Sequence, residues 1–250
     1  LLPLMEKLTT GRTAALLSPN LDDAGDWRPV FDWASVINLG GIVYIGLDSL
    51  SDYEVAAAVG NSMFADLTSV AGSIYKFGTG RGLPGETPPR RIAIHADEFN
   101  ELIGDEFIPL LNKAGGAGFQ VTAYTQTWSD VEARIGSQAK AGQIAGNFNT
   151  LIMLRVKEVA TAELLTSQLP EVRIVSTIVS SSVSDTNDPG DFADFASRNE
   201  DRISTESAPM LAPSDLVQLP KGQAFALIHG GQLHKIRMPL PSAASDPLMP

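Results

Sequence analysis

The chain has 250 residues, is 44% hydrophobic, carries a formal net charge of −11 and contains no cysteine. This length and composition allow one large domain or two small ones, and the lack of cysteine excludes disulfides and thiolate metal sites. The acidic balance argues against a broad basic face for nucleic acid, but it leaves room for a few DNA contacts on loops that line a channel.

The first third of the chain predicts two helical regions with one strand between them. Residues 1–33 indicate the end of a helical region followed by a loop, and the apolar run at 41–47 predicts a buried strand. Ser51 and Glu54 have capping-box spacing and predict a helix that runs to about Tyr75. No apolar run approaches the ~20 residues needed to cross a bilayer.

A loop rich in glycine and proline is predicted at residues 78–90. Its glycines at 78, 80 and 82 suggest a phosphate-binding loop at first sight. That interpretation is rejected, because no Gly-Lys-Ser/Thr follows and the prolines after these glycines prevent a helix from starting.

Strands and helices then alternate along the chain. Strands are predicted at 91–96, 119–126 and 150–156, and helices at about 101–111, from Ser129 onward and at 158–169. This order implies right-handed crossovers and an α/β fold, with a mostly parallel sheet and helices on both faces. Further on, 172–182 predicts another strand, and 223–229 with 232–238 predicts a hairpin turned by Gly230 and Gly231.

Two adjacent acids, Asp97 and Glu98, follow the strand at 91–96. Open α/β sheets bind ligands at the carboxyl ends of their strands. The first acid can hold Mg²⁺ directly or through water, and the second can orient and deprotonate an attacking water, the arrangement called Walker B. The alternative is that the acids are favoured only by a helix dipole. The buried strand before them favours the ligand site, because carboxylates at a sheet rim need a partner for their charge.

Other polar side chains near strand ends extend the predicted site. Gln126 ends the neighbouring strand and can sense the γ-phosphate or the attacking water, or it is an exposed amide at the start of a loop. Arg155 near the end of the next strand is a candidate for binding the nucleotide of a neighbouring subunit, although pairing with a nearby acid is the favoured alternative. Lys113 and Arg134 are further basic candidates, with surface solvation as the alternative for each.

One part of a nucleotide site is missing from the sequence. No stretch matches G-x-x-x-x-G-K-[ST], the loop whose backbone amides and lysine cradle phosphates. Either that loop lies upstream of Leu1, or the chain does not hydrolyse nucleotide. The start lacks an initiator methionine and is typical of a piece from the middle of a larger protein.

Several motifs, taken in order, resemble those of one family. His95 to Asn100 is similar to a Walker B motif, and Ala123 to Thr127 is similar to the glutamine-tipped strand that follows it in the type IV secretion coupling proteins, the TraD/TraG-like conjugation ATPases. The chain resembles the C-terminal half of their motor domain. Further stretches that resemble the family are Gly41–Leu50, Met63–Leu67, Leu110–Gly118, Gly146–Thr150 with Arg155, Leu219–Phe225 and Lys235–Pro239.

The resemblance implies a RecA-like P-loop fold with a C-terminal hairpin, ATP and Mg²⁺ as cofactors, a homo-hexameric ring, and transport of DNA with its attached relaxase. It also implies relaxosome and secretion-channel partners, and an upstream membrane anchor at the cytoplasmic face of the bacterial inner membrane. The expected domains are the tail of an inserted helical domain at 1–26, the Walker B half of the RecA-like domain at 27–240, and a tail at 241–250. The missing phosphate-binding loop is the motif called Walker A, and without it we expect this segment alone to be inactive.

One position departs from the family pattern. Many relatives carry an arginine in the turn after the Walker B helix, and the matching turn here is Ala114-Gly115-Gly116. A basic residue that acts between subunits would then be Lys113, Arg134 or Arg155. Two alternatives to a DNA-translocating motor are a non-catalytic module of the same fold that binds relaxosome or channel partners, and another ring ATPase such as a chromosome-segregation pump.

Overall fold

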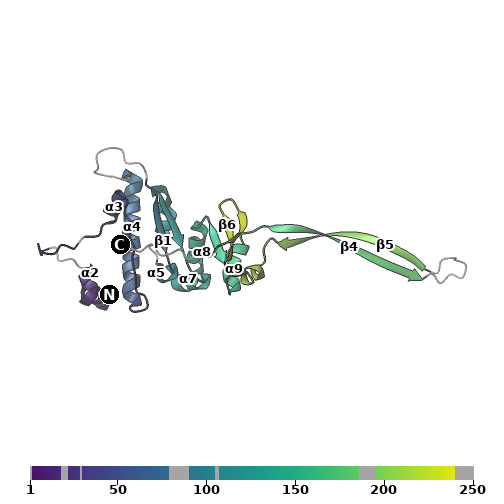
Figure 1. Ribbon diagram of the computed structural model, residues 1–250, viewed down its shortest axis with the longest axis horizontal. Helices are drawn as coiled ribbons and strands as arrows, with labels where there is room; N and C mark the ends of the chain where they lie inside the picture. The colour runs from purple at the N-terminus through teal and green to yellow at the C-terminus, as the bar shows by residue number, and fades with distance from the viewer. Residues whose placement is uncertain are drawn as a thin grey trace. The chain divides into compact units, whose positions relative to one another are not determined.

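The computed structural model describes residues 2–17, 22–28, 30–78, 90–104, 107–185 and 195–239. The chain divides into two compact units, Leu1–Asn149 and Thr150–Pro250, and each is described by itself (Figure 1). Residues 79–89 of the loop predicted at 78–90, and the tail at 241–250, lie outside the described residues. The domain boundaries expected at 26 and 240 stay predictions.

The first unit begins with helices. They are α1 (Leu2–Thr9), α2 (Gly11–Leu17), α3 (Trp33–Leu39) and the long α4 (Tyr53–Phe77). The predicted α4 is confirmed, but its cap differs from the prediction. Asp52 rather than Ser51 is the N-cap, and its carboxylate accepts a hydrogen bond from the Val55 amide at 3.2 Å. Ser51 instead donates its hydroxyl to Asp48 at 2.5 Å. A carboxylate one position later satisfies the free amides of the first turn equally well.

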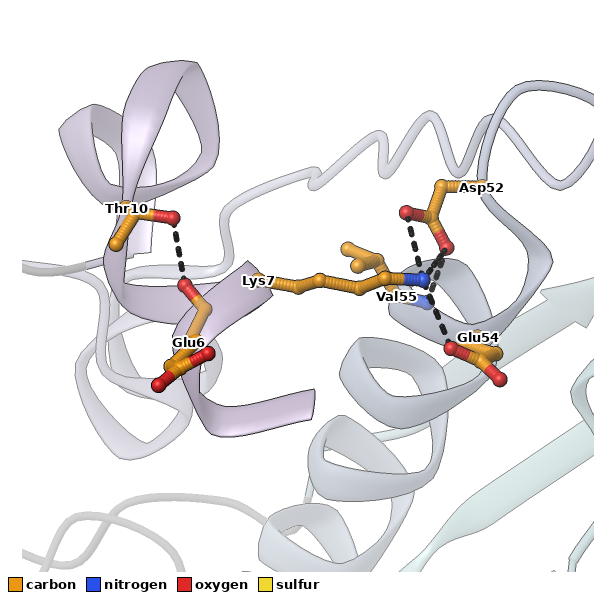
Figure 2. Close-up of polar contacts among 6 residues, drawn as sticks. All are labelled: Glu6, Lys7, Thr10, Asp52, Glu54 and Val55. Atoms are coloured by element: carbon orange, nitrogen blue, oxygen red, sulfur yellow. Dashed lines mark hydrogen bonds and ion pairs between the residues drawn. The ribbon is translucent and has the colours of Figure 1, made fainter. Parts of the chain in front are cut away.

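Lys7 of α1 ties the start of α4 to the N-terminal helices (Figure 2). Its ammonium donates to Glu54 Oε2 at 2.8 Å and lies 3.4 Å from Asp52 Oδ2. The hydrogen bond from the Val55 amide, followed by that from Lys7, lowers the pKa of Asp52. The bond to Glu54, followed by that to Asp52, raises the pKa of Lys7. Asp52 therefore stabilises the fold in its charged form.

Removing the Asp52 carboxylate is expected to change how stability depends on pH. A carboxylate whose pKa is lowered by folding stabilises the fold above the unfolded value of about 3.9, and this contribution is lost as pH falls through the lowered pKa. Asp52→Ala should therefore melt at a lower temperature than the wild type at pH 7, and the two melting curves should converge below pH 4. Thermal denaturation between pH 2 and 7 measures this. Glu54→Ala, which keeps the cap, is the control, and a gap that stays constant down to pH 2 would contradict the assignment.

A two-stranded parallel sheet forms the centre of the rest of the first unit. Strand β1 (Ile92–Ala96) pairs with β2 (Phe119–Ala123), from Ile92 opposite Phe119 to Ala96 opposite Ala123. The surrounding helices are α5 (Phe99–Leu102), α6 (Phe107–Lys113), the 3₁₀ turn η1 (Ala114–Ala117), α7 (Trp128–Ile135) and α8 (Gln138–Asn147). The single helix predicted at about 101–111 is thus divided into α5 and α6. The cap of α7 is Thr127, two positions before the predicted helix start at Ser129, and its hydroxyl accepts a hydrogen bond from the Asp130 amide at 3.2 Å.

Aromatic side chains form the core of the first unit. Phe107 is 1% exposed, and its ring centroid lies 5.2 Å from that of Phe64 on α4 and 5.7 Å from that of Phe99 on α5. Ile103 and Leu110 extend the same cluster. The core therefore joins α4 to the helices that flank the C-terminal end of β1.

The apolar run at 41–47 is not a strand in the structure, so the prediction of a buried strand there is wrong for this chain. These residues have no regular secondary structure, and Ile42 and Tyr44 are 100% and 94% exposed. A strand needs a neighbour that pairs with its backbone groups, and among the described residues no strand pairs with this run.

The second unit is built from antiparallel strands. They are β3 (Leu151–Leu154), β4 (Glu171–Asp185), β5 (Phe195–Pro209), β6 (Gln223–Ile228) and β7 (Gln232–Arg237), with helices α9 (Val159–Thr166) and α10 (Pro213–Val217). The predicted closing hairpin is confirmed as β6–β7, with Gly230 and Gly231 at φ 90° and 76° in its turn. These positive angles favour glycine.

Strand β3 corrects one element of the predicted topology. It was expected to continue a parallel sheet, but it pairs antiparallel with β6, Leu151 opposite Leu227. Leu165, Leu216 and Leu227 lie in the apolar cluster beside this sheet. The described fold is therefore α/β with a small parallel sheet and separate antiparallel sheets. A complete, mostly parallel P-loop sheet is not seen within the described residues.

Candidate functional site

The carboxyl ends of β1 and β2 are joined by backbone hydrogen bonds. The Tyr124 amide donates to the Ala96 carbonyl at 2.9 Å, and the Phe99 amide donates to the Tyr124 carbonyl at 3.0 Å. These bonds continue the β1–β2 register past the ends of the strands. They hold the loop that carries Asp97 and Glu98 beside the loop that leads to Gln126.

The structure therefore places three of the predicted residues at one edge of one sheet. Asp97 and Glu98 follow β1 directly, and Gln126 stands three positions after Ala123, the last residue of β2. All three side chains are exposed. This edge is where α/β sheets bind their ligands.

Glu98 has an unusual backbone conformation. Its φ of 46° makes it the one non-glycine residue with positive φ among those that the structure describes. The Asp97 carboxylate accepts the Glu98 amide at 3.0 Å and supports this turn. Residues held in the left-handed region cost free energy, on the order of 1–3 kcal/mol, and such residues cluster at functional sites.

The same geometry bears on the helix-dipole alternative for the two acids. Glu98 is the N-cap of α5, but its side chain accepts no capping hydrogen bond. The α5 helix has only four residues, so its dipole is small. Helix capping therefore does not explain an acid at this position, and the Glu98 carboxylate makes no capping hydrogen bond.

Two polar residues that the sequence did not single out connect the two loops. Thr125 donates its hydroxyl either to Asn100 Oδ1 or to the Thr127 carbonyl, both at 3.1 Å. Asn100 in turn donates to Glu101 Oε1 at 3.3 Å. These bonds orient the chain immediately before Gln126. There was little signal for them in the sequence, since Asn100 stands two positions after Glu98 and Thr125 lies within the strand predicted at 119–126.

His95 takes part in a second link between the strands. Its Nδ1 lies 3.1 Å from the Tyr124 hydroxyl, and the two rings are stacked with centroids 6.2 Å apart. The His95 side chain is exposed, so this contact lies at the surface rather than in the core.

The basic candidates lie in three different settings. Arg134 places its guanidinium carbon 5.0 Å from the centroid of the Tyr53 ring, a cation–π contact that joins α7 to the start of α4. Lys113 is exposed at the end of α6. Arg155 is exposed directly after β3, in the second unit. Of the three, Arg134 has a structural contact that accounts for its presence.

The carboxylates by themselves do not form a closed metal site. Within the described ranges no group of three or more His, Cys, Asp or Glu could hold a metal ion. Mg²⁺ is commonly bound by one or two carboxylates together with phosphate oxygens and water. Asp97 fits that mode, in which a nucleotide and water would supply the remaining ligands.

The part of the chain with assigned structure contains no helix long and apolar enough to cross a membrane.

The family model described as the TraM recognition site of TraD and TraG matches residues 91–221, more than half of the chain. The chain belongs to this family of conjugative coupling proteins. The match covers β1, β2 and the candidate site, and it continues through β5. It confirms the family proposed from the motifs in the sequence.

Solved structures of the bacterial conjugative coupling protein TrwB share the fold. The trigonal form in complex with sulphate aligns with a TM-score of 0.61 at 18% identity over 84% of this chain and 43% of that chain. The complex with the non-hydrolysable ATP analogue ADPNP has a TM-score of 0.58 at 17% identity, over 84% and 43%. The complex with ADP and Mg²⁺ has a TM-score of 0.55 at 19% identity, over 86% and 45%.

The chain thus spans less than half the length of the TrwB structures that it matches. Identities below one in five establish a common fold and nothing finer. Comparison with curated proteins gave no match.

Proposed function

We propose that this chain is the Walker B half of the motor of an ATP-driven, DNA-translocating coupling protein for conjugative transfer through a type IV secretion system. The observation that supports this most directly is the pair of hydrogen bonds between Ala96, Phe99 and Tyr124. These bonds bring Asp97 and Glu98 to the same sheet edge as Gln126. The fold shared with TrwB, which has been solved with ADPNP and with ADP and Mg²⁺, supports nucleotide binding by the complete protein.

Each residue at the edge has a separate role in the proposed hydrolysis. Asp97 would hold Mg²⁺ directly or through water, and a bound ion there would supply positive charge to the phosphate oxygens. Glu98 orients the attacking water and accepts its proton as the oxygen bonds to the γ-phosphorus and ADP leaves. Gln126 contacts the γ-phosphate or that water, and in this way it distinguishes ATP from ADP.

The remainder of the proposed site comes from outside these residues. A phosphate-binding loop supplies the second wall, and a basic residue of a neighbouring subunit completes the charge stabilisation. Lys113 and Arg155 are the favoured candidates for that residue, since Arg134 already contacts Tyr53. Assembly as a homo-hexamer, transport of DNA with its relaxase, contact with the secretion channel, and a position at the cytoplasmic face of the inner membrane through an upstream anchor belong to the same proposal.

The proposal predicts that nucleotide affinity depends on chain outside this segment. The 250-residue chain lacks the phosphate-binding loop, so titration calorimetry should show ATP binding no tighter than a Kd of about 1 mM, near −4 kcal/mol. The complete protein should bind at least 100-fold more tightly. A tight complex of ATP with the segment alone would contradict this division of the site.

A second candidate function is supported by the family description. A TraM recognition site is named for the region that matches residues 91–221, so the same fold could serve as a non-catalytic module that binds a relaxosome protein. The two functions are distinguished by turnover in the complete protein. A motor hydrolyses ATP through Glu98, whereas a module binds its partner equally well with Glu98→Gln.

A further inference from the structure

Strands β4 and β5 form a two-stranded ribbon that is drawn as the long pair of arrows in Figure 1. Each strand has 15 residues, and they pair antiparallel from Glu171 opposite Pro209 to Asp185 opposite Phe195. No other strand in the described part of the chain pairs with either outer edge of this ribbon. Both edges therefore present unpaired backbone groups over a considerable length.

The two edges differ in charge. Strand β5 carries Asp201, Arg202 and Glu206, whereas β4 has no charged residue from Ile174 to Ser184. Charged side chains on an edge strand discourage pairing with other chains, and a long uncharged edge is a template for it. The β4 edge is therefore the one suited to accept another strand.

One face of β4 carries a row of exposed valines. Val175, Val179 and Val183 stand at intervals of four residues and share one face of the strand, and they are 65%, 64% and 67% exposed. The valine in the middle lies four residues from each of the others, so the row is symmetric about Val179. Arg173 and Asp185 stand just outside the uncharged run, six residues on either side of Val179, and Glu171 lies two positions beyond Arg173.

We propose that β4 is a docking edge for β4 of a second copy of this chain, paired antiparallel about a two-fold axis at Val179. This register sets Val179 opposite Val179 of the other copy and Val175 opposite Val183. It also sets Arg173 of each copy opposite Asp185 of the other. Shifting the centre to residue 177, 178, 180 or 181 places at least one of the valines opposite a different residue type, or beyond the described strand.

A second copy fits this edge better than an unrelated partner, because the valine row and the charged residues on either side of it are complementary to those of an identical, antiparallel strand. A two-fold contact joins copies in pairs, so it differs from the contacts that would close a ring. The inference is independent of the nucleotide site, and Glu98→Gln should leave the pairing unchanged.

Site-specific disulfide formation tests the register. The chain contains no cysteine, so Val179→Cys introduces the only thiol. Residues directly opposite in an antiparallel pair have Cβ atoms about 4.5–5.5 Å apart, within reach of the roughly 3.5–4.5 Å that a disulfide requires after a small adjustment. Under mild oxidation the Val179→Cys chain should form a covalent dimer at least tenfold faster than Val175→Cys or Thr205→Cys, a matched β-branched position on β5.

A mixture of variants gives an independent readout of the same register. Val175→Cys and Val183→Cys should cross-link poorly when each is oxidised alone and at least tenfold faster when mixed. This arm keeps the test informative if Val179→Cys fails to fold. Equal cross-linking at all positions, faster cross-linking through Thr205→Cys, or a chain that stays monomeric and uncross-linked in both arms would overturn the proposal. A chain whose β4 edge pairs with another protein instead would give the last of these results.

Discussion

Glu98→Gln in the complete protein is expected to lower ATP turnover by about 10²–10⁴-fold while nucleotide affinity stays near that of the wild type. The amide keeps the size of the side chain and cannot accept the proton of the attacking water. Binding is spared because the triphosphate is held chiefly by the phosphate-binding loop and Mg²⁺. Steady-state hydrolysis and equilibrium binding of a fluorescent ATP analogue, measured on the same preparation, separate the two effects.

A matched control distinguishes loss of the base from a general effect of changing a glutamate. Glu163 on α9 is exposed and lies in the second unit, so Glu163→Gln makes the same chemical change outside the unit that carries Asp97, Glu98 and Gln126. It should turn over ATP at the wild-type rate. Normal turnover in Glu98→Gln would exclude Glu98 as the base.

Phe107→Ala is expected to produce the largest loss of stability in the first unit. The ring is 1% exposed and packs against both Phe64 and Phe99. Truncating a buried phenylalanine costs about 3–5 kcal/mol, because apolar contacts are lost and a cavity remains. A domain is stable by only about 5–15 kcal/mol in total. Urea denaturation should therefore show a much lower midpoint, measured by circular dichroism.

The control for this substitution is Phe77→Ala at the end of α4, where the side chain is 57% exposed. It should shift the midpoint far less, since most surface substitutions change stability by about 0.5 kcal/mol or less. Equal midpoints for the two variants would show that Phe107 is not in a packed core. Because Phe99 follows the acidic pair directly, destabilising this cluster should also loosen the candidate site.

The local elements that the sequence predicted well are those with a strong pattern of their own. The long helix that ends near Tyr75, the strand before Asp97 and the Gly230-Gly231 hairpin each depend on spacing or turn residues within a short window. The positions of the helix caps were predicted less well, because aspartate and threonine are also good N-cap residues. Asp52 and Thr127 cap α4 and α7, and each stands within two residues of a serine.

Pairing partners could not be predicted in the same way. An apolar run predicts a strand but does not specify its neighbour, so the parallel assignment of 150–156 was wrong, and the strand predicted at 41–47 is not formed. Strand β5 was missed because Asp201, Arg202 and Glu206 interrupt any apolar alternation. It forms because β4 pairs with it along its whole length.

The candidate site was predicted from one principle, that parallel strands deliver their following residues to a common edge. Asp97, Glu98 and Gln126 were found in this way, and the backbone bonds at Tyr124 support it. The positive φ of Glu98 and the Thr125–Asn100 link depend on loop geometry, which no residue pattern encodes.

The most direct test of the proposed nucleotide site is a structure of the complete protein with Mg²⁺ and a non-hydrolysable ATP analogue. The account predicts an Asp97 carboxylate oxygen either bound to Mg²⁺ at about 2.1 Å or separated from it by one coordinated water. It predicts the Glu98 carboxylate about 2.6–3.2 Å from a water in line with the γ-phosphate. A nucleotide bound at another edge of the sheet, with Asp97 and Glu98 facing solvent, would contradict it.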